Sequence, residues 1–238
     1  MPGSVLAEVQ RAFAGSGIDL AALGLAWARV LPIVTIVPAF GLKALPATAR
    51  FVIALALAAA IAPSVSMDGG AHAVRLLEEV TRGVGIAIAA AVPLWAATMA
   101  GGVIDSLRAT SDQVSAPTVE GRATPLGVPL SILASAIFLA GGGASRVIAA
   151  LVRAEVATTN PVVVAAHDLV AGIALAVAVG GPVLAASIVI ELGAALVARA
   201  ASPAQIHLLL APLRAFAVLI VLAIGIDRIA EALALSMK

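Results

Sequence analysis

Cysteine is absent from this sequence and charged residues are scarce. The chain of 238 residues contains no Cys, which excludes disulfides and thiolate metal sites. Only 11% of its residues are charged and 62% are hydrophobic, with a mean hydropathy of +1.14. A water-soluble domain carries about 25% charged residues. Because this chain lacks the polar surface that such a domain shows to water, its composition predicts an integral membrane protein.

The sequence also lacks an excess of charge of either sign and the alternation that marks barrel strands. Its formal net charge is +1, which does not indicate a nucleic-acid partner. Long runs of Ala, Leu, Val and Ile take the place of a period of two. Because backbone polar groups in lipid must be satisfied internally, we predict an all-α, polytopic membrane protein that forms a single domain over residues 1–238.

Catalytic motifs are missing as well. His72, His167 and His207 do not have the ligand spacing of HExxH. The glycine-rich stretches 83–85 and 141–143 are not followed by the Lys and Ser/Thr of a phosphate-binding loop. We therefore expect no catalytic site, no metal site and no cofactor, and the sequence does not predict an enzyme.

Five to seven hydrophobic segments are expected, and Pro or Gly interrupts several of them. A short amphipathic helix is expected first, over residues 3–14. The hydrophobic segments follow at residues 18–42, 51–67, 83–104, 125–144, 162–190 and 205–235, with an amphipathic stretch at 145–161. Pro93 predicts a bend. Gly180, Gly181 and Pro182 predict either a hairpin of two half-segments or a strongly broken helix.

Charged residues occur beside two of these segments. Arg75, Glu78, Glu79 and Arg82 are spaced to form ion pairs along one helix, and we interpret them as the solvated start of the third segment. Glu191 follows an apolar run. An ionisable residue at membrane depth is a candidate functional site, but we expect Glu191 to lie at an interface or to pair with a neighbouring helix.

A polar loop over about residues 105–124 separates the third and fourth segments. Pro117, Gly121 and Pro125 disfavour a continuous helix through it. A loop of this length is usually functional or disordered, so it is our candidate site, with a solvent-exposed connector as the alternative. Its candidate residues are Asp105, Arg108, Asp112, Gln113, Pro117, Glu120 and Arg122.

Several short motifs occur in a specific order over about residues 25–225. The stretch "RVLPIVTIVPAFGLKALPATARFVIALALAAAIAP" contains an Arg, a Pro-x-Phe-Gly, an elbow Pro, a basic residue and a closing Pro. These fall at Arg29, Pro38, Phe40, Gly41, Pro46, Arg50 and Pro63. Later matches are Glu79, Gly83, Ala100, Gly101, Ile104 and Asp105, then Gly141, Gly142 and Gly143, and finally Gly193, Arg199, Ala200, Pro212, Leu213 and Arg214. Together they resemble the FliR/SctT family, inner-membrane components of the type III secretion export apparatus of bacterial flagella and injectisomes.

The sequence departs from the family pattern in two places, and the second indicates which branch of the family it resembles. Ser202 and Pro203 stand where the family more often has Pro-Gln. The loop lacks the Gln-x-Gly usual in flagellar members, and "DSLRATS" is similar to the Asp-x-x-Arg-Gly of injectisome members, with Ala109 in place of Gly. The resemblance therefore favours the injectisome branch.

The resemblance implies a protein-conducting export gate in the bacterial inner membrane. One copy of this chain would assemble with P/R-type and Q/S-type subunits into a helical hetero-oligomeric pore for unfolded secreted proteins. The loop at 105–124 would plug the closed channel, since a pore lumen tolerates irregular polar backbone at membrane depth. A small-solute or ion transporter with a broken-helix binding site is the alternative. A third reading, a permease subunit of an ATP-driven transporter, calls for a coupling helix that we do not find.

Overall fold

Helices make up nearly all of the part of the chain that the computed structural model describes, namely residues 19–40, 46–65, 72–107, 114–115, 122–153, 160–200 and 207–237. The helices are α2 (Leu20–Ile36), α3 (Ala47–Ile61), α4 (His72–Leu107), α5 (Gly127–Ala140), α6 (Gly143–Arg153), α7 (Pro161–Ala200) and α8 (His207–Ser236), with the 3-10 turns η1 (Pro38–Phe40) and η3 (Ala62–Ser64). Two-residue strands β1 (Val114–Ser115) and β2 (Arg122–Ala123) pair antiparallel. The predicted all-α fold is confirmed.

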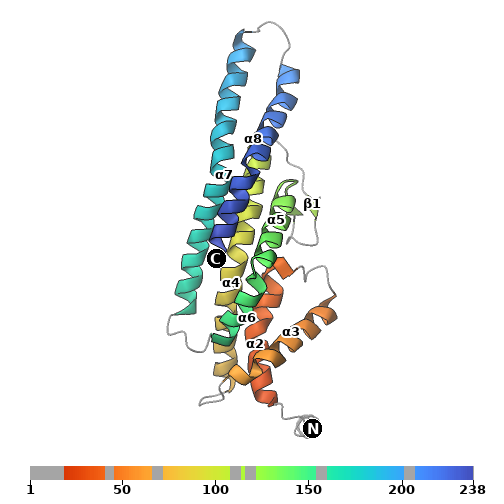
Figure 1. Ribbon diagram of the computed structural model, residues 1–238, viewed down its shortest axis with the longest axis vertical. Helices are drawn as coiled ribbons and strands as arrows, with labels where there is room; N and C mark the ends of the chain where they lie inside the picture. The colour runs from red at the N-terminus through yellow and green to blue at the C-terminus, as the bar shows by residue number, and fades with distance from the viewer. Residues whose placement is uncertain are drawn as a thin grey trace.

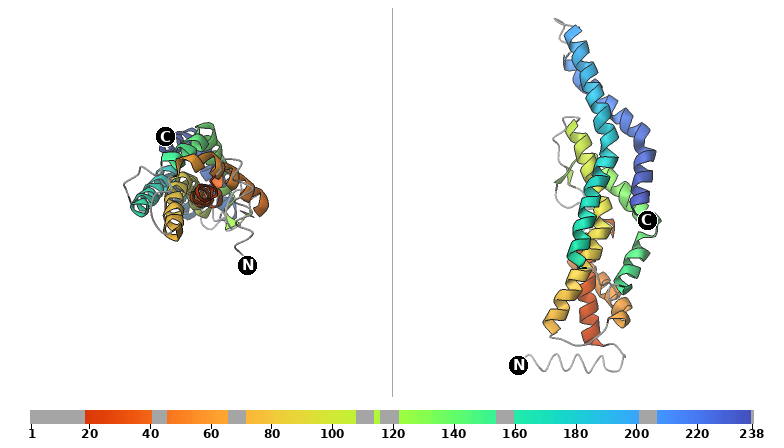
Figure 2. Two further views of the ribbon diagram at one scale, coloured as in Figure 1. Left: turned by 90° about the horizontal axis from the view of Figure 1, so that it is seen from below. Right: turned by 90° about the vertical axis from the view of Figure 1, so that its left-hand side faces the viewer.

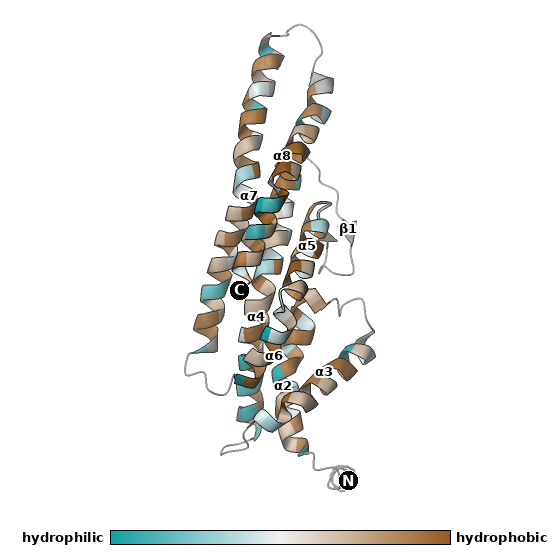
Figure 3. Ribbon diagram, viewed as in Figure 1, coloured by the Kyte–Doolittle hydropathy of each residue, from teal (hydrophilic) through white to brown (hydrophobic). Residues whose placement is uncertain are grey.

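The long helix α4 is the centre of the structure. It runs beside α7 along the long axis, while α2, α5 and α6 pack on its other flank (Figure 1). Helix α8 returns antiparallel to α7, and the hairpin of these two helices projects beyond the end of α4 (Figures 1 and 2). Most residues of these helices are hydrophobic (Figure 3).

Small residues allow α4 and its neighbours to approach closely. The buried face of α4 includes five alanines, at positions 87, 91, 96, 97 and 100, each at most 1% exposed. On α7, a Cβ added at Gly172 would overlap the Val92 side chain, and one at Gly180 would lie 3.8 Å from the Cα of Ala100. Close packing of this kind holds helices together in lipid, where the hydrophobic effect between them is lost.

The break expected at Gly180, Gly181 and Pro182 is wrong, because α7 is one continuous helix of 40 residues with Pro182 inside it. Proline removes one backbone hydrogen bond, but an apolar environment offers the neighbouring peptide groups no acceptor outside the helix. Gly172 and Gly180 hold the part of α7 before Pro182 on α4, and α8 packs along α7 as well. Tertiary contacts therefore override the local signal.

Three helical stretches are long and apolar enough to cross a membrane: Ala47–Ser64, His72–Ser106 and Val162–Ala200. A fourth crossing results if α5 and α6, bent by 66° at their junction, count as one span. Helix α2 has only 17 residues, so the first segment is shorter than the predicted 18–42. It ends because Val37, which precedes Pro38, adopts an extended conformation.

Candidate functional site at the two ends of α4

A buried ion pair joins α2 to the beginning of α4. Arg29 is 0% exposed, and its Nε donates a hydrogen bond to Oε2 of Glu79, which is itself 2% exposed. The other carboxylate oxygen, Oε1, accepts a hydrogen bond of 2.8 Å from Nη1 of Arg82. Glu79 thus receives two charge-assisted bonds, which is how a carboxylate is retained away from solvent.

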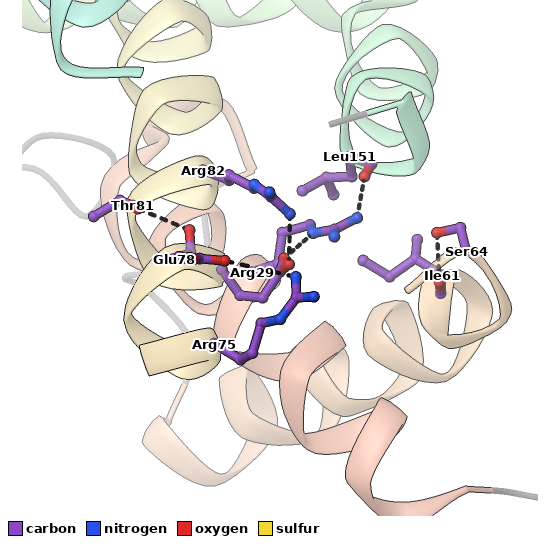
Figure 4. A network of polar contacts seen from close by, with 9 residues as sticks. Arg29, Ile61, Ser64, Arg75, Glu78, Thr81, Arg82 and Leu151 are labelled. Atoms are coloured by element: carbon purple, nitrogen blue, oxygen red, sulfur yellow. Dashed lines mark hydrogen bonds and ion pairs between the residues drawn. The ribbon is translucent and has the colours of Figure 1, made fainter. Parts of the chain in front are cut away.

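The same guanidinium reaches the end of α6. Arg29 Nη1 donates to the carbonyl oxygen of Leu151 at 2.8 Å (Figure 4). The last carbonyl groups of a helix have no partner within the helix, and its carboxyl end carries partial negative charge. Leu151 lies in the last turn of α6, so Arg29 satisfies an orphan carbonyl with a favourable charge. One side chain thereby connects three helices.

Gly83 explains why α2 and α4 come close enough for this contact. A Cβ added at Gly83 would overlap the carbonyl oxygen of Arg29. Only glycine leaves room for that approach. Gly83 lies one helical turn after Glu79, so the close approach and the ion pair occupy the same face of α4.

The prediction that Arg75, Glu78, Glu79 and Arg82 form a solvated helix start is wrong for Glu79. The exposed pair of that group is Arg75 with Glu78, at 3.6 Å (Figure 4). Glu79 instead points into the buried contact with Arg29. The spacing along one helix could not show this, because the partner lies 50 residues earlier in the chain.

A second buried carboxylate lies in the last turn of α4. Asp105 is 0% exposed, and its Oδ2 accepts a hydrogen bond of 2.6 Å from the backbone N–H of Leu126. Leu126 is the N-cap residue of α5, where N–H groups lack helical partners. The side chain therefore ties the end of α4 to the start of α5 across the polar loop.

Glycines bring these two helices into contact beside Asp105. A Cβ at Gly101 would lie 2.5 Å from the Cα of Gly127, the first residue of α5. Thr124 Oγ1 accepts a hydrogen bond from Gly127 N–H at 3.2 Å. The base of the loop is therefore fixed by a carboxylate, a hydroxyl and a glycine contact.

The loop itself starts later than predicted. Asp105 belongs to α4, which continues to Leu107, because its carboxylate is engaged at the base of the loop and not within it. Strands β1 and β2 pair Val114 with Ala123 and Ser115 with Arg122, so part of the loop is a small antiparallel hairpin. The other predicted loop residues, Arg108, Asp112, Gln113, Pro117 and Glu120, lie outside the described residues.

The remaining motif residues are dispersed over the fold. Pro38 and Phe40 form η1, where the Phe40 ring meets the Phe138 ring edge-on at 6.2 Å. Pro46 is the N-cap of α3 and Arg50 lies in its first turn, whereas Gly41 is outside the described residues. Gly142 separates α5 from α6, Gly193 and Arg199 lie on exposed parts of α7, and Pro212 and Arg214 lie on α8.

Glu191 has the neighbouring-helix partner that we expected. Its Oε2 lies 3.1 Å from Nη1 of Arg214, which links α7 to α8. The two side chains are 53% and 34% exposed. Among the described residues, no group of three His, Cys, Asp or Glu side chains could hold a metal ion.

The comparison with known protein families covers nearly all of this architecture. A family model described as "Bacterial export proteins, family 1" matches residues 20–238, from the first residue of α2 onward. No curated protein matches the sequence significantly. The match, together with the long apolar helices, identifies a multi-pass protein of the bacterial inner membrane that functions in type III protein export. The chain belongs to the bacterial export proteins, family 1, the FliR/SctT family of the type III export apparatus.

Proposed function

We propose that this chain is a structural subunit of a protein-conducting export gate, assembled with P/R-type and Q/S-type subunits, one copy per complex. In this proposal the loop between α4 and α5 closes the channel. The buried contacts of Arg29 and Asp105 hold the helices that carry the loop. The chain contributes no covalent chemistry; it forms part of the wall and the closure of a passage for unfolded secreted proteins.

The observation that carries the proposal is the surface of the projecting α7–α8 hairpin. Large apolar side chains cover it, with Val189 of α7 69% exposed and Ile224 of α8 77% exposed. On the same hairpin, the Glu191–Arg214 pair is also partly exposed. Lipid accepts the apolar side chains, but a half-exposed ion pair is costly in hydrocarbon. A protein partner can cover both kinds of group, which favours a hetero-oligomer.

The base of the polar loop supports a role for the loop as a plug. Asp105, Thr124 and the Gly101–Gly127 contact hold its two ends together. With both ends held, the loop stays attached at the junction of α4 and α5. Irregular polar backbone at membrane depth is tolerated where it lines a water-filled cavity, and the lumen of a gate is such a place.

The alternative of a small-solute transporter has less support. It relied on broken helices near Pro93 and near Gly180–Pro182, and α4 and α7 are continuous there. It also relied on Glu191 as an ion-coupling group, and Glu191 is paired with Arg214. The discontinuity that remains is the bend between α5 and α6.

Co-purification tests the proposed assembly. The full chain, tagged after Lys238, is expressed with the genes next to its own, and the mass of the intact detergent-solubilised complex is measured. We expect a complex with one copy of this chain and several copies of two other hydrophobic proteins. A monomer or a symmetric homo-oligomer would refute the assembly and favour the transporter.

Deletion of residues 111–120 tests the plug separately. We expect cells that carry the deletion in the assembled complex to leak small solutes, because the closed channel loses its obstruction. Replacement of the same residues by a Gly/Ser segment of equal length is the control for loop length. Unchanged permeability with normal assembly and export would rule out the plug while leaving the structural role intact.

A further inference from the structure

A cavity of about 230 Å³ lies at the bend between α5 and α6. Its walls come from α4, α5, α6 and the carboxyl-terminal end of α8, and most of them are apolar. Ile86 and Pro93 of α4, Phe138 of α5, Val147 of α6 and Met237 lie around it, and Arg146 is the charged residue in its lining. This chamber is separate from both buried carboxylates described above.

Three consecutive glycines create the bend that borders the cavity. Gly142 has a φ of +74°, a left-handed conformation that residues with a side chain rarely adopt. A Cβ at Gly143 would lie 2.6 Å from the Phe138 ring. The chain therefore bends sharply at this point, and α6 leaves α5 at 66°. The glycine triplet therefore shapes the side of the cavity that α5 and α6 form.

Arg146 places a positive charge at this bend. A Cβ on Gly141 would lie 3.7 Å from Nη2 of Arg146, so the guanidinium folds back over the junction of α5 and α6. The side chain is half-buried. Within the part of the chain that the structure describes, it makes no hydrogen bond or ion pair. The first turn of α6, whose peptide dipoles are positive at that end, opens on the same space through Gly143.

Among the described residues that line the cavity, none carries a negative charge. Helix α6, "GASRVIAALVR", contains two Arg and no acidic residue. The lining segments of α4 and α5 contribute Ile86, Ala89, Ala90, Pro93 and Phe138, and α8 contributes Ser236 and Met237, none of which is charged. A half-buried cation beside apolar walls in a membrane protein calls for an anion that carries its own apolar part.

We propose that the cavity binds an anionic membrane lipid, with Arg146 contacting the phosphate of the headgroup and the apolar walls receiving the first part of an acyl chain. Basic pockets between membrane helices bind acidic lipid headgroups by the same combination of charge and apolar contact. Such lipids surround any protein of the bacterial inner membrane, so the ligand is present wherever this chain resides. The site holds α4, α5, α6 and the end of α8 in one arrangement.

Lipid-dependent stability tests the site. The full chain is purified with the membrane proteins that accompany it, delipidated, and reconstituted in nanodiscs of phosphatidylcholine with or without phosphatidylglycerol. We expect phosphatidylglycerol to raise the thermal midpoint, and Arg146→Gln to weaken phosphatidylglycerol binding about fivefold, the effect of one basic residue at an anionic surface. Arg153→Gln is the matched control, because Arg153 is exposed on the same helix and does not line the cavity.

A second variant and a second ligand separate the possible occupants. Ala150 lines the cavity, so Ala150→Leu, which leaves Arg146 in place, should fill the space and also reduce lipid binding. Stabilisation of the delipidated protein by inorganic phosphate alone, to the same extent as by phosphatidylglycerol, would show a free-anion site and overturn the proposal. Equal losses in Arg146→Gln and Arg153→Gln would also overturn it, since general surface charge would then account for binding. If Ala150→Leu still bound phosphatidylglycerol as strongly as the unchanged protein, the acyl chain could not occupy the cavity, and the proposal would be overturned.

Discussion

Arg29 and Glu79 form an ion pair from which solvent is excluded, at 0% and 2% exposure, between helices that are 50 residues apart in the sequence. The pair is also bonded to Arg82 and to the carbonyl of Leu151. Buried charges are retained where they are paired and hydrogen-bonded, and Nε and Nη1 of Arg29 meet this condition although Nη2 has no partner among the described residues. The contact therefore sets the relative positions of α2, α4 and α6.

Loss of one member of this pair should be costly. We expect Glu79→Gln or Arg29→Met to reduce the stability of the assembled protein by about 3–5 kcal/mol, because the remaining charge is left buried without a partner. The double variant should be less destabilised than the sum of the two single variants. Thermal unfolding in detergent measures both effects.

Glu78→Gln is the control for that measurement. Glu78 is next to Glu79, and its side chain is 48% exposed in a pair with Arg75. An exposed pair contributes about 0–1 kcal/mol, so this variant should melt close to the unchanged protein. Similar losses in Glu78→Gln and Glu79→Gln would contradict the role of the buried pair.

Gly83→Ala should separate α2 from α4. The added methyl group would overlap the Arg29 carbonyl oxygen, and a backbone atom cannot move aside as a flexible side chain can. We expect a clear loss of thermal stability and of assembly with partner proteins. Gly24→Ala on α2 is the matched control, because no atom lies within 4 Å of a Cβ there. It should be neutral or slightly stabilising, since Ala favours helix over Gly by about 1 kcal/mol.

Asp105→Ala should loosen the base of the loop. The change leaves the N–H of Leu126 without its acceptor, and an unsatisfied buried donor costs about 1–3 kcal/mol. We expect increased proteolysis between α4 and α5 in the assembled protein, and solute leakage if the loop plugs a channel. Ser106→Ala is the control, because the Ser106 hydroxyl is exposed and donates to Val103 of its own helix. Protease sensitivity equal to that of Ser106→Ala would show that Asp105 does not secure the loop.

Glu191→Gln distinguishes a structural subunit from an ion-coupled transporter. Glu191→Gln removes the negative charge of the Glu191–Arg214 pair, but the oxygen of the Gln side chain can still accept a hydrogen bond from Arg214, so we expect the complex to assemble. If the chain is an export-gate subunit, secretion of export substrates should continue at or near its normal rate. An abolished function in a fully assembled complex would assign Glu191 a coupling role and revive the transporter alternative.

Composition and hydropathy were sufficient to predict the membrane class, the all-α fold and the approximate location of most helices. These properties depend on local runs of apolar residues. The ion pair of Arg29 with Glu79 could not be predicted from spacing, because it depends on how α2 packs against α4. A signal was nevertheless present: both residues interrupt or border apolar segments, and both belong to the motifs that resemble the family.

Local rules failed where tertiary packing opposed them. Gly180, Gly181 and Pro182 predict a break, yet α7 continues through them along α4. At residues 105–107 the polar side chain of Asp105 predicted the start of a loop, yet Asp105 lies in the last turn of α4. In both cases a residue distant in the sequence makes the contact: Gly180 packs against Ala100, and Asp105 accepts a hydrogen bond from the N–H of Leu126.

The unbroken course of α7 has a consequence for where this chain can reside. At a rise of 1.5 Å per residue, its 40 residues extend about 60 Å, twice the roughly 30 Å thickness of bilayer hydrocarbon. The helix is apolar over almost its whole length, with a hydropathy of 2.4 in its most apolar window. A membrane can therefore enclose about half of its length when the helix is upright, and about two-thirds at a tilt of about 40°. The remainder needs a covering other than lipid, so the length of α7 constrains any assembly that contains this chain.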